Sequence, residues 1–124
     1  SSKSYEWIRT LKLCDNSGSI LLKAAGSSIP YGGEFYGPSS YFYIAPETER
    51  SYLNLMQLIN DREVGVFNSK SHNLESIKYF TRFVAQNFKV FGFCPGVSLK
   101  MIDRIFTGVC YQGAWSYLAP PNNY

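Results

Sequence analysis

The sequence has few of the residues that carry most metal and thiol chemistry. It holds 3 cysteines and 1 histidine among 124 residues. No two cysteines are spaced as C-x-x-C, so the motif typical of zinc ribbons and redox sites is missing. An odd number of cysteines cannot all pair, which favours reduced thiols. We expect Cys94 and Cys110 to be buried as free thiols.

Long apolar runs are missing as well. No stretch approaches the roughly 20 residues of a membrane-spanning helix, and residues 1–10 do not resemble a signal peptide. The charge balance is small, with 12 basic against 9 acidic residues, and the basic residues are scattered along the chain. We therefore expect neither a membrane nor a nucleic acid as a partner.

Apolar residues and rings, in contrast, are plentiful. Apolar residues make up 45% of the chain and aromatic residues 17%. This composition suits a folded core and argues against disorder, which requires low hydrophobicity and high charge. The length suits one domain. We expect the two tryptophans, Trp7 and Trp115, to be core anchors.

The first 46 residues predict β-structure with one open alternative. Residues 1–24 indicate either a helix followed by a strand or a hairpin that turns at Asn16–Gly18. Residues 25–46 are rich in Gly, Ser, Pro and Tyr, and predict an aromatic hairpin with strands at 33–36 and 40–44.

From residue 46 onward, helical and strand patterns alternate. Apolar residues at helical spacing predict a helix capped by Thr48 and ending near residue 61, a second over 74–84, and a third capped by Ser98 and ending before Gly113. Short apolar runs predict strands at 64–67, 88–93 and 115–118. This alternation predicts an α/β fold with a parallel sheet.

The loop between the first strand of this series and its helix is where α/β folds bind phosphate. Residues 67–74 contain no glycine and no Gly-Lys-Ser/Thr motif. We interpret Lys70 and His72 as solvated side chains, with phosphate contact as the alternative. Ser69 and Ser71 lack an identifiable base and are read as loop or capping residues rather than nucleophiles.

Four segments, in the same order along the chain, resemble the dynein heavy chain family in its first AAA+ module. Residues 5–7 resemble the family's Phe-Glu-Trp, and residues 31–37 its Tyr-x-Tyr-Glu-Tyr-x-Gly hairpin. Residues 42–52 are similar to its Leu-Val-Ile-Thr-Pro-Leu-Thr-Asp-Arg-x-Tyr. Residues 105–115 resemble its Phe/Leu-x-Gly-Leu helix end and the Gly-Ala-Trp that follows.

The resemblance implies a partial P-loop NTPase fold, the AAA+ large subdomain, which is a three-layer sandwich with parallel strands preceded by a β-hairpin. It implies that residues 1–24 are the end of a linker and residues 25–124 the N-terminal half of the module, a fragment of a longer chain. The implied partners are the rest of a dynein-like ring and linker and other axonemal dynein subunits. The implied setting is the cytoskeleton of a cilium or flagellum, notably the sperm axoneme, as in the dynein heavy chain domain-containing proteins, which are divergent relatives of ciliary dyneins.

The departures from the family pattern fall on its chemistry. Counting back without gaps from Gly-Ala-Trp, the family's phosphate-binding Lys falls on Asn73 and its Mg²⁺-binding Thr on Leu74. The metal-holding Asp falls on Ala119 and the catalytic Glu on Pro120. Because phosphoryl transfer depends on positioning and charge neutralisation, we expect no ATP hydrolysis and no catalytic residue.

Three functions follow from the resemblance. The first is a structural, non-catalytic module in a ciliary dynein-related protein, with no cofactor expected. The second is a module that holds ATP or ADP without hydrolysis, and the third, which we disfavour, is an active motor ATPase. Ile44 and Pro46 resemble the family's adenine-contacting stretch; the other interpretation is a strand end that leads into a helix. The residues of such a degenerate nucleotide pocket would be Ile44, Pro46, Ser69, Lys70, Ser71, His72 and Asn73.

Overall fold

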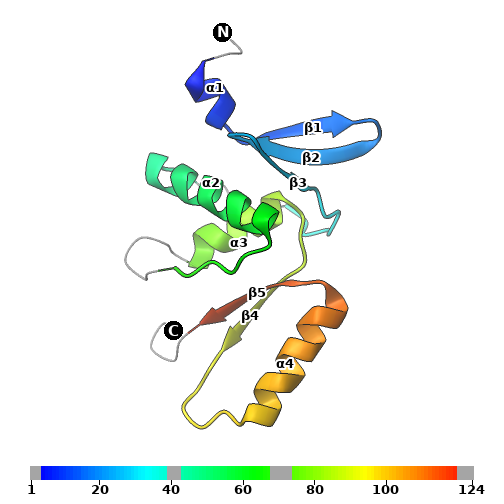
Figure 1. Cartoon of the computed structure of the whole chain (residues 1–124), viewed down its shortest axis with the longest axis vertical. Coiled ribbons are helices and arrows are strands. Elements are labelled where there is room, and N and C mark those ends of the chain that lie inside the picture. Colours follow the sequence, from blue (N-terminus) through cyan, green and yellow to red (C-terminus); the bar gives the residue numbers. More distant parts are fainter. Residues whose placement is uncertain (1–3, 39–42, 68–73, 120–124) are drawn as a thin grey trace. The chain divides into compact units, whose positions relative to one another are not determined.

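The structure is a computed structural model that describes residues 4–38, 43–67 and 74–119 (Figure 1). It divides into two compact units, Ser1–Ala85 and Gln86–Tyr124. The first unit contains α1 (Tyr5–Arg9), β1 (Lys12–Asn16), β2 (Ser19–Ala24), β3 (Ser27–Pro30), α2 (Pro46–Asp61) and α3 (Leu74–Phe83). The second contains β4 (Phe88–Gly92), α4 (Leu99–Gln112) and β5 (Trp115–Ala119).

Two tight hairpins build the antiparallel sheet β1-β2-β3 of the first unit. Ser17-Gly18 and Ala25-Gly26 are the two-residue turns, and all four residues have positive φ. Turns of this kind match the twist of the strands that they join, and glycine adopts positive φ without strain. Since α1 precedes this sheet, residues 1–24 form both of the predicted alternatives, a helix and a hairpin. The strand β3 was not predicted.

The helix α2 begins at Pro46, earlier than the sequence predicted. Its N-cap is Ala45, in an extended conformation, so the prediction of Thr48 as the cap was wrong. Proline suits the first helical position because its φ is already helical and it has no N–H to leave unbonded. The predicted end of this helix, near residue 61, is confirmed at Asp61.

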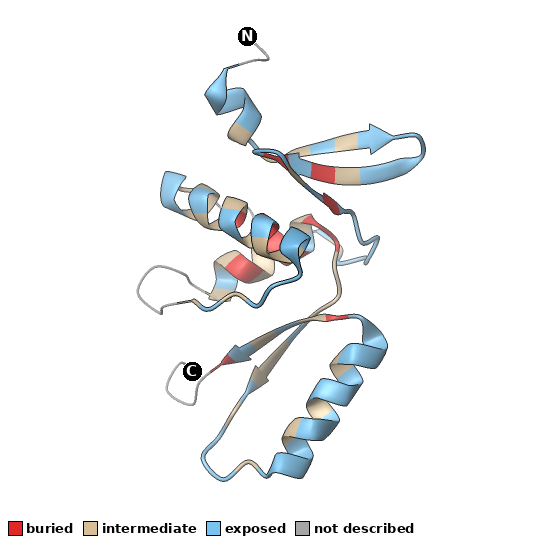
Figure 2. Cartoon of the chain, in the orientation of Figure 1, coloured by how far each residue is buried: buried red, intermediate tan, exposed pale blue. Residues whose placement is uncertain are grey.

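The core of the first unit forms where α2, α3, β2 and β3 bury their apolar faces (Figure 2). The rings of Tyr52 on α2 and Phe80 on α3 pack with their centroids 4.9 Å apart, and α2 also packs against β3. The inward faces that apolar spacing predicted for both helices are therefore confirmed. The largest fully buried side chains are Phe80, Leu22, Ile29, Met56, Val84 and Thr81.

The expected hairpin over residues 33–44 does not form as predicted. Residues 33–36 belong to no strand. The N–H groups of Gly32 and Glu34 instead donate to the carbonyl oxygens of Val84 and Ala85, at 2.9 Å each. These carbonyls lie just past the end of α3, so the segment satisfies the backbone of a helix terminus rather than that of a strand. Of the second expected strand, residues 40–42 lie outside the described residues, and 43–44 form no strand.

Residues 64–67 also belong to no strand, and that prediction was wrong. A strand is stabilised by hydrogen bonds to a neighbouring strand, and the two sheets found among the described residues, β1-β2-β3 and β4-β5, do not include this segment. Val64 and Val66 are exposed as a consequence. The apolar pattern had indicated a buried strand.

The second unit is a strand–helix–strand crossover. β4 and β5 pair in parallel along their whole length, with α4 as the connection between them. Parallel neighbours require a connection of this length. Ser98 caps α4 by accepting a hydrogen bond from the Met101 N–H at 3.3 Å, as the sequence predicted. The parallel sheet and the α/β fold are therefore confirmed.

Some surface positions differ from expectation. Cys94 and Cys110 are exposed rather than buried. Trp7 is 53% exposed, on a helix that has no buried residue, and is therefore not a core anchor. The Lys12 ammonium lies 4.1 Å from the centroid of the Trp7 ring, a cation–π contact that an exposed indole favours. Within the described ranges, no helix combines the length and apolar character needed to cross a membrane.

Candidate functional site

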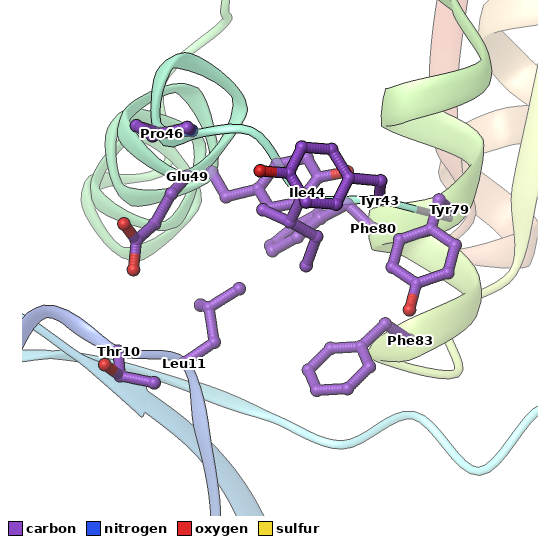
Figure 3. Close-up of a pocket in the computed structure, with 10 residues that line it drawn as sticks. Thr10, Leu11, Tyr43, Ile44, Pro46, Glu49, Tyr79, Phe80 and Phe83 are labelled. Carbon is purple, nitrogen blue, oxygen red and sulfur yellow. The ribbon is translucent and has the colours of Figure 1, made fainter. Parts of the chain in front are cut away.

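A cavity of about 330 Å³ lies in the first unit, between α2, α3 and the segment that joins α1 to β1 (Figure 3). Its volume is at the small end of protein ligand sites, which span about 300–1,000 Å³. Half of its wall is aromatic, and such walls stack on flat, neutral rings. The lining residues are Thr10, Leu11, Tyr43, Ile44, Pro46, Glu49, Tyr52, Tyr79, Phe80 and Phe83.

Among the described residues that line the cavity, Glu49 is the one that is charged. It extends from the first turn of α2, and its Oε2 lies 3.4 Å from Nη2 of Arg9. Figure 3 shows its carboxylate on the side of the cavity where Thr10 lies. The side chains of Arg9 and Glu49 are 39% and 21% exposed, so water partly screens the pair.

Tyr52 forms a fixed part of the wall. Its hydroxyl donates a hydrogen bond to the backbone carbonyl of Ser76 at 2.8 Å. Burial raises the pKa of the Tyr52 phenol well above its usual range, and the neighbouring Tyr79 adds to the increase. The phenol is therefore neutral at physiological pH and acts as a hydrogen-bond donor that joins α2 to α3, not as a base.

The structure brings together two of the residues that the sequence singled out. Ile44 and Pro46 both line the cavity, and Pro46 is also the first residue of α2. Of the strand-end interpretation, the entry into a helix is confirmed at Pro46, but residues 43–44 form no strand. Nucleotide contact by these residues stays a prediction. The other predicted pocket residues, Ser69, Lys70, Ser71, His72 and Asn73, lie outside the described residues, as does Pro120.

The carboxyl end of β5 is the second place that the sequence singled out. Ligands of parallel α/β sheets bind beyond this end of the strands. Ala119 is the last residue of β5, is buried, and accepts a hydrogen bond from the Phe93 N–H at 3.2 Å through its carbonyl. Residues 104–124 contain no Asp or Glu. This strand end thus offers no carboxylate, the side chain by which proteins usually hold Mg²⁺.

Leu74 is the first residue of α3. The N-terminus of a helix attracts phosphate through its free N–H groups, although no strand precedes α3 at residues 64–67. In P-loop proteins a Ser or Thr hydroxyl binds the Mg²⁺ ion. That Leu74 takes the place of this residue stays a prediction, and leucine has no oxygen to supply. Within the part of the chain that the structure describes, no three His, Cys, Asp or Glu residues gather as a metal site.

Sequence reasoning missed several residues of the cavity wall. Thr10 and Leu11 come from a distant segment that only the fold brings beside α2. Tyr79 adjoins Phe80, which apolar spacing had predicted to face inward, and this adjacency was the one signal available for it. No sequence pattern linked Glu49, which lies near the start of a predicted helix, to a cavity.

Comparison with known proteins identifies the family. The family model described as "Hydrolytic ATP binding site of dynein motor region" matches residues 31–122. The chain belongs to this dynein family. The match covers α2, α3 and the whole crossover β4-α4-β5, so the fold is a partial AAA+ P-loop NTPase fold.

Individual dynein heavy chains match almost the whole chain. "Dynein-1-beta heavy chain, flagellar inner arm I1 complex" of Chlamydomonas reinhardtii is 28% identical over 95% of it. "Cytoplasmic dynein 2 heavy chain 1" of Caenorhabditis elegans is 28% identical over 93%, and "Dynein axonemal heavy chain 6" of Homo sapiens is 29% identical over 91%. The chain spans 3% of the length of each of these relatives.

Proposed function

We propose that this chain is a dynein-type AAA module that does not hydrolyse ATP and that contributes structure to a larger dynein-related protein. Residues 1–24 would be the end of its linker and residues 25–124 the N-terminal half of the module. Its partners would be the remaining modules of the ring and other dynein subunits.

One observation carries this proposal: the carboxyl end of β5 has no carboxylate. Ala119 occupies the end of the strand, Pro120 follows it, and no acidic residue occurs after Asp103. Catalysis of phosphoryl transfer requires a metal ion that neutralises the charge on the phosphates, and that ion requires oxygen ligands. In the proposed alignment, Asn73 also replaces the family's phosphate-binding lysine, and Leu74 replaces its Mg²⁺-binding threonine. A neighbouring side chain can replace one of these groups, whereas the loss of all four is much harder to compensate.

The setting that we propose is the cytoskeleton of a cilium or flagellum. The support is that two of the three relatives described above carry flagellar or axonemal names, while the third is named as cytoplasmic. The structural role thus extends to assembly of an axonemal dynein-related complex, with no membrane or nucleic acid involved.

Steady-state phosphate release from Mg-ATP by the purified chain tests the loss of hydrolysis. Lys70→Ala is the matched variant, because Lys70 is the one cation in the loop of residues 68–73 when His72 is neutral. We expect both proteins to release phosphate at the rate of the buffer blank. Release that saturates with ATP and falls at least tenfold in Lys70→Ala would contradict the proposal.

A second function is favoured by the cavity. Ile44 and Pro46 line it together with aromatic side chains, and this wall suits the base of a nucleotide. The module would then hold ATP or ADP without turnover. Because base contacts of this kind are apolar, they do not depend on the residues lost at positions 73, 74, 119 and 120.

Thermal melts with increasing ADP or ATP test this second function. A ligand that binds only the folded state raises the melting temperature as the ligand concentration increases. At 100 times its Kd, it adds about 2.7 kcal/mol to the free energy of unfolding. We expect Ile44→Glu to abolish the rise, because it places a carboxylate at the wall. Ile20→Glu, the same substitution at a similarly exposed isoleucine on β2, should keep it. No rise in a folded wild-type chain would rule out this function.

A further inference from the structure

The N-terminal helix is weakly attached to the rest of its unit. α1 has five residues and none of them is buried. Tyr5 is 75% exposed. An isolated helix of this length is unstable in water. One backbone hydrogen bond, from the Ala25 N–H to the Ile8 carbonyl at 2.9 Å, joins the end of α1 to the sheet. Few buried contacts place this segment among those that open most easily.

The same segment nevertheless forms one side of the cavity. Thr10 and Leu11, which directly follow α1, both line it. Figure 3 shows the side chain of Leu11 extending from the sheet side toward the space that Ile44 and Phe83 enter from other elements. The cavity is partly open, since its lining residues Tyr43 and Ile44 are exposed. If α1 and these residues move away from α2, the cavity also loses this side and opens further to solvent.

A single ion pair joins α1 to a cavity-lining residue of α2. Arg9 is the last residue of α1, and Glu49 lies in the first turn of α2. Their 3.4 Å contact spans the two elements beside Thr10. We propose that residues 4–11 form a strap over the cavity that the Arg9–Glu49 ion pair holds closed. This proposal depends on no particular ligand and is independent of whether the module binds nucleotide.

Amide hydrogen exchange of the full chain measures the strap directly. The Thr10 N–H bonds to the Glu6 carbonyl within the strap, and the Ala25 N–H bonds to Ile8. We expect Arg9→Ala and Glu49→Gln each to raise exchange at both amides about two- to fivefold, the effect of a partly exposed ion pair. The double variant should exchange no faster than either single variant, since both changes remove the same interaction.

Three controls separate the strap from general destabilisation. Glu47→Gln, the same change at an exposed glutamate of the same helical turn, should leave exchange unchanged. The Val84 N–H, which bonds to Phe80 in the core, should be unaffected in every variant. The charge swap Arg9→Glu with Glu49→Arg should restore slow exchange. Unchanged exchange in both single variants, or additive effects in the double variant, would overturn the proposal.

Cysteine labelling measures closure of the cavity. Phe83→Cys is introduced with Cys14→Ser and Cys94→Ser, and Cys110 is kept as an exposed internal reference in the second unit. We expect Glu49→Gln to speed the reaction of N-ethylmaleimide at position 83 about two- to fivefold relative to Cys110. Equal relative rates with and without Glu49→Gln would show that the ion pair does not close the cavity.

Discussion

The two units differ in how much apolar surface they bury (Figure 2). In the first, Phe80, Met56 and Leu22 are fully buried, and α2 and α3 pack through an aromatic contact. In the second, α4 has no buried residue, and the buried apolar residues among those described are two alanines, Ala114 and Ala119.

This difference shows that the same apolar periodicity leads to different degrees of burial. Burying a large apolar side chain contributes about 1.5–3 kcal/mol, so most of the folding free energy should come from the first unit. The second unit, whose helix α4 has no buried residue, should contribute less. Stability should therefore respond strongly to core substitutions in the first unit and weakly to similar ones in the second.

The largest expected effect is at the centre of the first core. Phe80→Ala should cost about 3–5 kcal/mol, because it removes a fully buried ring and leaves a cavity. Phe106→Ala on α4, where the ring is 48% exposed, should cost less than about 1 kcal/mol. Urea unfolding followed by circular dichroism measures both. If Phe80→Ala does not fold, Phe80→Leu takes its place in the comparison. Equal losses of unfolding free energy in the two units would contradict the expected difference between them.

A smaller effect is expected at Tyr52, which joins the two helices of the first unit. Tyr52→Phe leaves the Ser76 carbonyl without its hydroxyl partner and should cost about 1 kcal/mol at neutral pH. Because folding raises the pKa of this phenol, the unfolded chain loses its proton first, near the ordinary pKa of about 10. The contribution of the protonated Tyr52 phenol to the free energy of unfolding is therefore fully present below that pH and is lost as pH rises above it.

Thermal melts at pH 8 and pH 11 test whether stability falls in alkali as expected. The wild-type midpoint should fall more between the two values than that of Tyr52→Phe. Tyr111→Phe on α4 is the matched control, since Tyr111 is 90% exposed, and it should melt like the wild type at both values. An equal alkaline loss in Tyr52→Phe and wild type would contradict the account of Tyr52.

Effects of similar or smaller size are expected at the two helix starts. Ser98→Ala removes the side-chain cap of α4 and should cost about 1 kcal/mol. Ala45→Ser offers a cap to α2, whose N-cap has no side-chain oxygen, and should gain about 0.5 kcal/mol. Both changes are measured by urea unfolding. A neutral Ser98→Ala would mean that α4 does not depend on its own cap.

The sequence predicted the local elements better than their partners. Helical spacing and the cap at Ser98 correctly predicted α4 and the parallel crossover that it forms, because both depend on residues close in sequence. Residues 64–67 have the composition of a strand but no neighbouring strand in either sheet. Strand β3 was missed because Ser27–Pro30 is polar at one end and ends in proline, a residue that is rare inside strands.

The candidate site was predictable only in part, and for a similar reason. The resemblance singled out Ile44 and Pro46, which lie within one short segment, and both line the cavity. Leu11 and Glu49 lie far apart in sequence, and no local pattern links them. The missing carboxylate after β5 could be recognised in the sequence because its position follows directly from the strand that precedes it.

A single-turnover measurement shows whether this dynein-family module hydrolyses ATP at all, and we propose that it does not. The purified chain, in large excess over ATP labelled at the γ-phosphate, is incubated with Mg²⁺, and released phosphate is followed over hours. We expect phosphate to form no faster than in buffer alone. Complete conversion of the ATP by the wild-type chain, abolished in Lys70→Ala, would contradict it and show that the loop of residues 68–73 supports catalysis without the strand-end carboxylates.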